Sequence, residues 1–225
     1  MNEKQINAQM AVMVRMQDEL NKQVFADWRH RNLAWHRAIY IEAGEYLDHL
    51  GTWKWWKKGS PDLAQARMEL IDIWHFGISW YMDQLKNDAP EVVIDFISRQ
   101  FSYFMAHAQA GLAGKEITPE AHHEVVDQLV QRAGAREFSI SAFAALMVCC
   151  GLSFEDLYRG YVGKNMLNRF RQSNGYKAGT YVKEWAGKED NVHLDEILQS
   201  LPLDEQLPDA VYAALSLRYT DLTKA

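Results

Sequence analysis

Hydrophobic residues recur at spacings of three and four along most of the chain, which is the period of an α-helix. Met10, Met13, Val14, Leu20 and Val24 form such a stripe near the N-terminus. No alternating run of β-branched residues is bounded by the Asn-Gly or Asp-Gly turns that mark hairpins. The pattern therefore predicts an all-α chain. We expect helices at residues 4–25, 29–50, 61–86, 90–112, 119–133, 138–150 and 153–172, with short helices at 193–200 and 208–219.

Several of these helices carry a recognisable start signal, in which a capping side chain is followed by proline or an acid. Such signals occur at Ser60-Pro61-Asp62, Thr118-Pro119-Glu120 and Ser153-Asp156. A polar, glycine-containing segment follows from 173 to 191, and we expect it to form a loop. No linker and no fixed-period repeat divides the chain. We therefore expect one all-α catalytic domain over residues 1–225, with the helices of 90–150 as a looser lobe.

The composition argues against several classes of protein. The 225 residues include 24 Lys and Arg against 30 Asp and Glu, so the net charge is −6, which argues against general nucleic-acid binding. The two cysteines, Cys149 and Cys150, are adjacent and cannot build a disulfide framework. The N-terminal segment has no apolar run of the secretory type, and no apolar stretch is long enough to span a bilayer. We expect a soluble cytoplasmic protein with no membrane partner.

Two pairs of acids at helical spacing are the strongest chemical signal. Glu42 and Glu45 are three apart on one expected helix, and Glu69 and Asp72 repeat this spacing on the next. Residues three apart share a helix face. A short connection would bring the two helices back antiparallel, so the four carboxylates would converge among apolar neighbours. Such a group cannot stay ionised without cations, and oxygen ligands favour Mg²⁺ or Mn²⁺.

Two other interpretations of the acids remain open at this point. Acids at this spacing also occur on the solvated faces of amphipathic helices. A di-iron bundle would need Glu-x-x-His on two helices. Asp72 and His75 have the corresponding spacing, but Glu42 is followed by Glu45, so only half of that motif is present. His49 follows Glu45 by four residues and Glu42 by seven, a spacing that would let it approach the metals, but we expect it on the helix surface. We expect His122 and His123 to be exposed.

The segment EAGEYLDHLGTWKWWKKGSPDLAQARMELIDIWHF, residues 42–76, resembles the all-α NTP pyrophosphohydrolase superfamily, and specifically its dimeric dUTPase (dUTP diphosphatase) family. The resemblance implies a helical bundle with antiparallel metal-binding helices. It also implies Mg²⁺, two or more ions per site with Mn²⁺ as a substitute, bound by Glu42, Glu45, Glu69 and Asp72. Glu42 and Glu45 are then the catalytic candidates. Of Trp55 and Trp56, we expect at least one to pack against the core.

A second block, YVGKNMLNRFRQSNGYKAGTYVKEWAGKEDN at 161–191, gathers cationic and amide side chains. Such groups suit a polyphosphate, although basic residues also favour any helix C-terminus. The block is similar to the second signature of the same family. That similarity implies five phosphate-binding residues: Lys164, Asn168, Arg171, Tyr176 and Lys183.

The remaining expectations concern the nucleoside. MQDELN at 16–21 resembles the first motif of the family, which implies that Gln17 and Asn21 read uracil, while Trp53, His75 and Asn191 line the base and sugar pocket. The family further implies metal-dependent hydrolysis of dUTP, and of dUDP, to dUMP by a homodimer. The alternatives are hydrolysis of another nucleotide on the same fold, or a regulatory protein-binding module whose partner is unknown.

Overall fold

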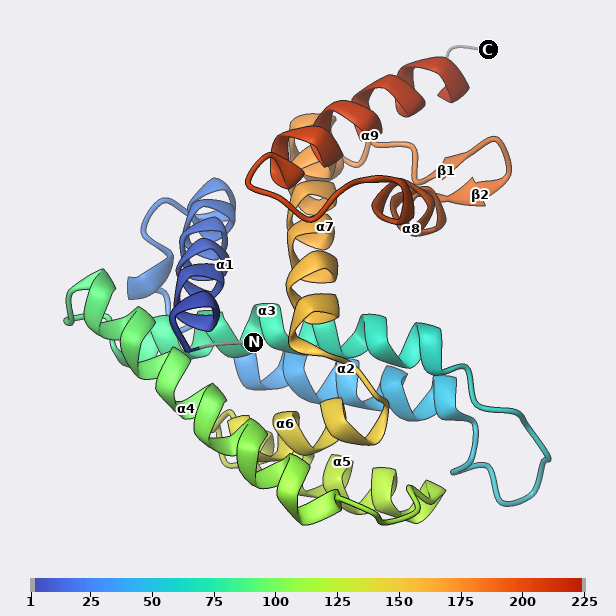
Figure 1. The fold of residues 1–225 in the computed structure, drawn as a ribbon. Helices are drawn as coiled ribbons and strands as arrows, with labels where there is room; N and C mark the ends of the chain where they lie inside the picture. Colours follow the sequence, from blue (N-terminus) through green and yellow to red (C-terminus); the bar gives the residue numbers. More distant parts are fainter. Residues whose placement is uncertain (1–2, 224–225) are drawn as a thin grey trace. The chain divides into compact units, whose positions relative to one another are not determined.

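The protein is built almost entirely from helices, as the hydrophobic period predicts (Figure 1). The computed structural model describes residues 3–223, and contacts between Cα atoms divide the chain into two compact units, Met1–Leu157 and Tyr158–Ala225. The first contains α1 (Glu3–Val24), η1 (Trp28–His30), α2 (Trp35–Leu50), α3 (Leu63–Gln84), α4 (Pro90–Leu112), α5 (Pro119–Gly134) and α6 (Ile140–Cys149). Helix α7 (Phe154–Ser173) begins in the first unit and continues into the second, which also holds η2 (Tyr176–Ala178), β1 (Glu184–Trp185), β2 (Lys188–Glu189), α8 (Asp190–Ser200) and α9 (Leu207–Thr223). The expected single catalytic domain stays a prediction.

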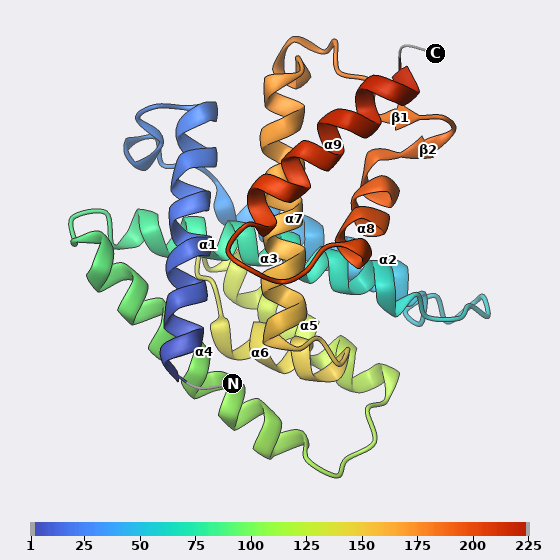
Figure 2. The ribbon, with the colours of Figure 1, turned by 45° about the horizontal axis from the view of Figure 1, so that its top comes forward.

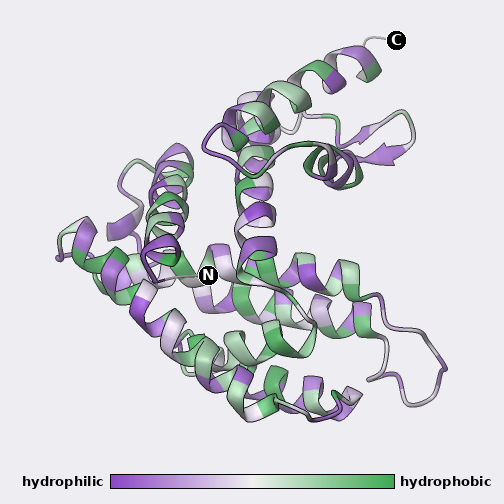
Figure 3. Cartoon of the chain, viewed as in Figure 1, coloured by the Kyte–Doolittle hydropathy of each residue, from purple (hydrophilic) through white to green (hydrophobic). Residues whose placement is uncertain are grey.

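Helices α2 and α3 form the central pair of the N-terminal unit, and they lie side by side in both views (Figures 1 and 2). Each buries an apolar face: Ile39 and Ala43 on α2, and Leu70 and Ile73 on α3, are inaccessible to solvent. Helix α5 packs against α2, while α1 contacts both α3 and α4. Polar and apolar segments alternate along these helices, as an amphipathic bundle requires (Figure 3).

An aromatic cluster fixes α3 against the helices that follow it. The Trp74 ring stacks on Phe143 at a centroid distance of 4.8 Å and lies 5.4 Å from Phe101. Gly77 permits a close approach here, because a Cβ atom at this position would lie 2.3 Å from the Phe138 ring. The residues of α3 that follow Glu69 are thereby held in a packed core, which keeps their polar neighbours in place.

The structure confirms most expected helices and corrects two starts. The helix expected from 29 begins at Trp35 instead, because Asn32 adopts a left-handed conformation, with φ of 48°, and ends the short 3₁₀ turn before it. Asp62, and not Ser60, caps α3, since its carboxylate accepts a hydrogen bond from the Gln65 amide at 3.1 Å. The predicted caps at Thr118 and at Ser153 with Asp156 are confirmed.

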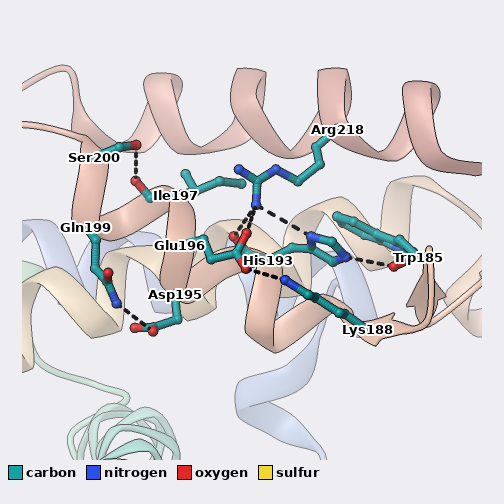
Figure 4. A network of polar contacts seen from close by, with 9 residues as sticks. All are labelled: Trp185, Lys188, His193, Asp195, Glu196, Ile197, Gln199, Ser200 and Arg218. Carbon is teal, nitrogen blue, oxygen red and sulfur yellow. Dashed lines mark hydrogen bonds and ion pairs between the residues drawn. The ribbon is translucent and has the colours of Figure 1, made fainter.

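The C-terminal unit contains a two-residue hairpin that the sequence pattern did not predict. Strands β1 and β2 pair antiparallel around Ala186 and Gly187, both with positive φ. The buried Trp185 ring stacks on His193 of α8, whose Nε2 donates to the Trp185 carbonyl at 2.9 Å (Figure 4). This contact ties the segment of 183–191 to α8. Segments this short carry no period that a sequence pattern can reveal.

No single helix in the described part of the chain is long and apolar enough to cross a membrane. One bent pair, Ile140–Cys149 with Phe154–Ser173, satisfies that test of length and composition when the two helices are taken together.

Candidate active site

Three of the four predicted acids converge between α2 and α3. Glu42 on α2 and Glu69 and Asp72 on α3 each place a carboxylate oxygen within 4.8 Å of the other two. Glu69 is only 8% exposed. Glu45 is exposed and lies outside this group of three, although its charge still acts on Glu42. We call Glu42, Glu69 and Asp72 the acidic cluster.

The electrostatics of the acidic cluster indicate a site for cations. Burial, followed by the negative charges of Asp72, Glu69 and Glu45, raises the pKa of Glu42 to about 8. Like charges this close cannot all ionise in a half-buried site unless a positive charge joins them. The donors are all carboxylate oxygens, which suits hard cations such as Mg²⁺ and does not suit a thiolate or imidazole site. The residues present therefore fit a divalent metal.

His49 is a neighbour of the acidic cluster that sequence reasoning placed on the helix surface. Its Nε2 lies 3.2 Å from Oε1 of Glu69, so the imidazole contacts an acid of the cluster. The signal was present in the sequence, because His49 follows Glu42 by seven residues and Glu45 by four, both of which are same-face spacings.

The predicted base-reading residues of α1 and α3 form one buried hydrogen-bond network. Gln17 Nε2 donates to Asn21 Oδ1 at 3.0 Å, and Gln17 Oε1 lies 2.7 Å from His75 Nδ1. Asn21 Nδ2 donates to the hydroxyl of Ser79 at 3.0 Å. The structure thus brings together Gln17, Asn21 and His75 and adds Ser79, which no motif indicated.

Trp53, another predicted nucleoside contact, lies on the loop between α2 and α3. Its ring meets the Trp56 ring edge to face at 5.3 Å, and Trp56 meets Trp55 in the same way. The expectation that Trp55 or Trp56 packs against the core is wrong, since Trp55 is 88% exposed and Trp56 is also exposed. No residue of the loop from 51 to 62 is buried, and these rings pack on one another.

The two adjacent histidines of α5 anchor the region around this loop, contrary to the expectation that both are exposed. The buried His122 shares a 2.6 Å hydrogen bond with the Tyr46 hydroxyl on α2. His123 lies 2.9 Å from the Thr52 hydroxyl at the start of the loop. Burial lowers the pKa of His122, so the neutral imidazole is the form that packs against α2.

The C-terminal unit holds the predicted phosphate-binding residues. One of them, Arg171, forms an ion pair with the buried Asp190. Arg171 on α7 donates through Nε and Nη2 to the two carboxylate oxygens of Asp190, at 2.8 and 2.7 Å. Asp190 is fully buried and also accepts from the Tyr181 hydroxyl at 2.9 Å. Burial alone would lower the pKa of Arg171, but the carboxylate outweighs it and the net shift is upward. We call Arg171, Asp190 and Tyr181 the arginine clamp.

The other predicted residues of this block surround the clamp. Arg171 Nη1 donates to Asn168 Oδ1 at 3.1 Å, and the guanidinium lies 5.9 Å from the Tyr176 ring centroid. Lys164 Nζ lies 3.4 Å from Asn191 Oδ1. Lys183 is exposed and forms a 3.3 Å ion pair with Glu189. The sequence analysis assigned Asp190 no role, because Asp190 acts by holding the guanidinium of Arg171.

A comparison with protein families supplies the identity. The family model described as dUTPase matches residues 9–176, well over half of the chain. The chain belongs to the dUTPase family. The matched span includes the acidic cluster, the network around Asn21 and Ser79, and Arg171. No curated protein matches the chain.

Membership of the dUTPase family makes the protein a hydrolase of nucleotide metabolism that acts on dUTP. dUTPases generally use a divalent metal, and the acidic cluster is a group of side chains in the described structure that suits one. The resemblance and the all-α fold expected from sequence are both confirmed. The individual roles of the site residues remain predictions.

Proposed function

We propose that the protein hydrolyses dUTP to dUMP and pyrophosphate, and dUDP to dUMP and phosphate, in a Mg²⁺-dependent reaction. The observation that carries the proposal is the convergence of Glu42, Glu69 and Asp72 in a chain of the dUTPase family. Their mutual repulsion is relieved when cations bind, and the cations in turn attract the phosphate chain of the substrate. The activity would remove dUTP from the nucleotide pool and supply dUMP.

Glu42, Glu69 and Asp72 would hold two or more Mg²⁺ ions, with Glu45 completing the ligand set and Mn²⁺ as a substitute. Bound Mg²⁺ lowers the pKa of a coordinated water and neutralises charge on the phosphates. A carboxylate of the Glu42 and Glu45 pair would accept the proton of the attacking water. His49 would keep the Glu69 carboxylate oriented through its 3.2 Å contact.

The predicted substrate contacts divide between the two units. Lys164, Asn168, Arg171, Tyr176 and Lys183 would bind the phosphates, because cationic and amide donors match phosphate oxygens. The ion pair with Asp190 supports this role for Arg171, since it fixes the guanidinium before any ligand arrives. Gln17, Asn21, His75, Trp53 and Asn191 would bind the nucleoside.

We also propose a cytoplasmic homodimer. The resemblance of residues 42–76 to the dimeric dUTPase family supports the homodimer. Ile41, which is adjacent to Glu42 and 55% exposed, is one apolar side chain that such an interface would cover. Light scattering on the purified protein tests this, and a monomer mass at micromolar concentration would contradict it.

Product release from dUTP, dUDP, dCTP, dTTP and UTP, measured with Mg²⁺ and then with EDTA, tests the proposal. We expect dUMP from dUTP and dUDP with metal only. Glu42→Gln should abolish turnover, because it removes a charged ligand with little change in volume. Glu124→Gln is the matched control, since Glu124 is exposed on α5 and should leave turnover unchanged.

The other outcomes separate the alternatives. Preferred turnover of dCTP or another nucleotide would keep the metal site and discard uracil as the recognised base. Turnover in EDTA would contradict a metal-dependent reaction. Failure to cleave any of the five nucleotides would overturn the proposal and favour a protein-binding role.

A further inference from the structure

The buried His193 of α8 lies between the β1–β2 hairpin and α9, and its contacts on the two sides require the same neutral tautomer (Figure 4). Its Nε2 lies 2.9 Å from the carbonyl oxygen of Trp185, which can only accept, so the imidazole proton is on Nε2. Its Nδ1 lies 3.5 Å from Nη1 of Arg218, and a guanidinium can only donate, so Nδ1 presents a lone pair. One neutral form of His193 therefore satisfies both partners.

Trp185 connects His193 to the segment that carries Lys183. The buried Trp185 ring stacks on the imidazole, with a centroid distance of 5.1 Å and an interplanar angle of 18°. The indole Nε1 donates to the Val182 carbonyl at 2.8 Å, so Trp185 holds the backbone before and after Lys183. The Lys183 carbonyl also accepts from the Asp190 amide at 2.9 Å, which closes the base of the hairpin. The backbone position of Lys183 therefore depends on contacts with α8.

The first turn of α8 also holds a second predicted phosphate contact, Arg171. Asp190 lies three residues before His193 and binds the Arg171 guanidinium through two hydrogen bonds, at 2.8 and 2.7 Å. This turn of α8 thus holds the guanidinium of Arg171 through one side chain and the segment of Lys183 through another. The distance between the two cationic residues is set by the packing of this one turn.

We propose that His193 is a positioning residue that keeps the backbone of Lys183 at a fixed distance from Arg171, so that both cations contact the phosphates of one nucleotide. The inference rests on the proposed function, in which these two residues bind the phosphates. A lysine on a fixed backbone loses less conformational freedom when it binds an anion than a lysine on a mobile segment does. The exposed pair of Lys188 with Glu196 contributes little to this anchorage, because water screens both charges (Figure 4).

A double variant distinguishes positioning from general damage. His193→Ala should raise KM for dUTP by about threefold, which corresponds to the loss of one hydrogen bond. The value of kcat should not change, because the acidic cluster belongs to the other unit. In a Lys183→Ala background, His193→Ala should raise KM no further, since a residue that acts through Lys183 has nothing left to position.

Three kinetic results would overturn the inference. The first is an unchanged KM in His193→Ala. The second is a further rise in KM when His193→Ala is added to Lys183→Ala, because the two residues would then act independently. The third is a fall in kcat without a change in KM, which would show that His193 supports the chemical step.

His193→Gln is the rescuing variant and Leu198→Ala is the matched control. A glutamine amide can donate to the Trp185 carbonyl and accept from Arg218, so KM should return to the wild-type value. Leu198 is also buried on α8, but it packs on α7, where a Cβ atom at Gly163 would lie 2.6 Å from its Cδ1. Leu198→Ala should lower the unfolding midpoint and leave KM unchanged. A raised KM in Leu198→Ala, or no rescue by glutamine, would overturn the inference.

Two NMR measurements test the anchorage without nucleotide or metal. The Asp190 amide, which donates to Lys183, should exchange its hydrogen about tenfold faster in His193→Ala, while the amides of α7 keep their rates. Equal rates at Asp190 in the two proteins would overturn the inference. In the wild type near pH 8, nitrogen-15 spectra should show the His193 proton on Nε2. A proton on Nδ1 would overturn the inference even if the variant does not fold.

These measurements also separate the inference from the proposed function. Loss of dUTP turnover in the wild type would overturn the proposed function, whereas hydrogen exchange and the tautomer of His193 report on the anchorage alone. Normal turnover with slow exchange at Asp190 in His193→Ala would keep the proposed function and discard the positioning role.

Discussion

The acidic cluster of the N-terminal unit gathers charges of one sign, whereas the arginine clamp of the C-terminal unit pairs opposite charges. In the cluster, three carboxylates of one sign lie within 4.8 Å, and the pKa of Glu42 rises to about 8. In the clamp, the opposite charges of Arg171 and Asp190 meet through two hydrogen bonds, and Tyr181 adds a third. The charges of the cluster would be balanced only by added cations, whereas the charges of Arg171 and Asp190 in the clamp already balance each other.

The difference predicts that the acidic cluster and the arginine clamp respond differently to the same kind of substitution. Removing a charge from the cluster relieves repulsion, so the metal-free fold should gain stability while the proposed metal site loses a ligand. Removing a charge from the clamp leaves a buried partner unpaired, which destabilises the fold. Stability and activity should therefore change in opposite directions in the cluster and in the same direction in the clamp.

The largest expected effect is on activity in the cluster. Glu69→Gln should lower kcat/KM for dUTP by about a thousandfold, or about 4 kcal/mol, because the proposed metal site would lose a ligand and its charge. In EDTA, the same variant should unfold at a higher temperature than the wild type. Steady-state kinetics and thermal unfolding test the two effects. A variant that is both inactive and less stable without metal would show that Glu69 serves packing.

The second effect is on stability in the clamp. Asp190→Ala should reduce the free energy of unfolding by about 3 kcal/mol, because Arg171 keeps a mostly buried charge without its carboxylate. It should also raise KM for dUTP, since the guanidinium is no longer held. Chemical denaturation gives the first quantity. Asp195→Ala, an exposed acid on the same helix, is the control and should leave both values unchanged.

The third effect links the cluster to pH. The pKa of Glu42 in the folded state, about 8, exceeds its usual value of 4.5, so the native state binds this proton more tightly than the unfolded chain. The contribution is present in full below pH 4.5 and is lost as the pH rises towards 8. Metal-free protein should therefore lose stability between pH 6 and pH 8, and Glu42→Gln should lose less.

Mg²⁺ should reverse that loss. At a hundredfold excess over its Kd, it should stabilise the protein by about 2.7 kcal/mol at pH 8. Its apparent affinity should fall towards pH 6, where it competes with the proton on Glu42. Calorimetric titration at the two pH values measures this, and equal affinity at both would contradict a protonated Glu42.

Sequence reasoning found acids that the structure brings together and missed residues that hold other side chains in place. Glu42, Glu69 and Asp72 could be found because helical spacing and one reversal of direction are enough to bring them together. Ser79 and Asp190 could not, since their partners lie 58 and 19 residues away and depend on how side chains pack. No local pattern encodes such contacts.

The fold shows the same division between regular and local structure. The helix of 90–112 was predicted to the residue, because its stripe is long and Pro90 marks its start. The start of α3 was placed two residues early, because Ser60, Pro61 and Asp62 all favour a helix start and only Asp62 reaches a free amide. The hairpin of β1 and β2 was missed because two residues cannot show a period.

The smallest effect concerns the exposed cation beside the clamp. Lys183 pairs with Glu189 at 3.3 Å, and both side chains are about half exposed to water. Such a pair contributes little to stability, so Lys183 can leave it for a phosphate without loss to the fold.

Lys183→Ala should raise KM for dUTP by about threefold to tenfold, with kcat and the unfolding midpoint unchanged, and added salt should reduce the difference. Lys188→Ala is the control, since Lys188 is a similarly exposed cation paired with Glu196 and has no predicted phosphate contact. An equal change in both variants would show that Lys183 acts through net charge alone and does not contact a phosphate.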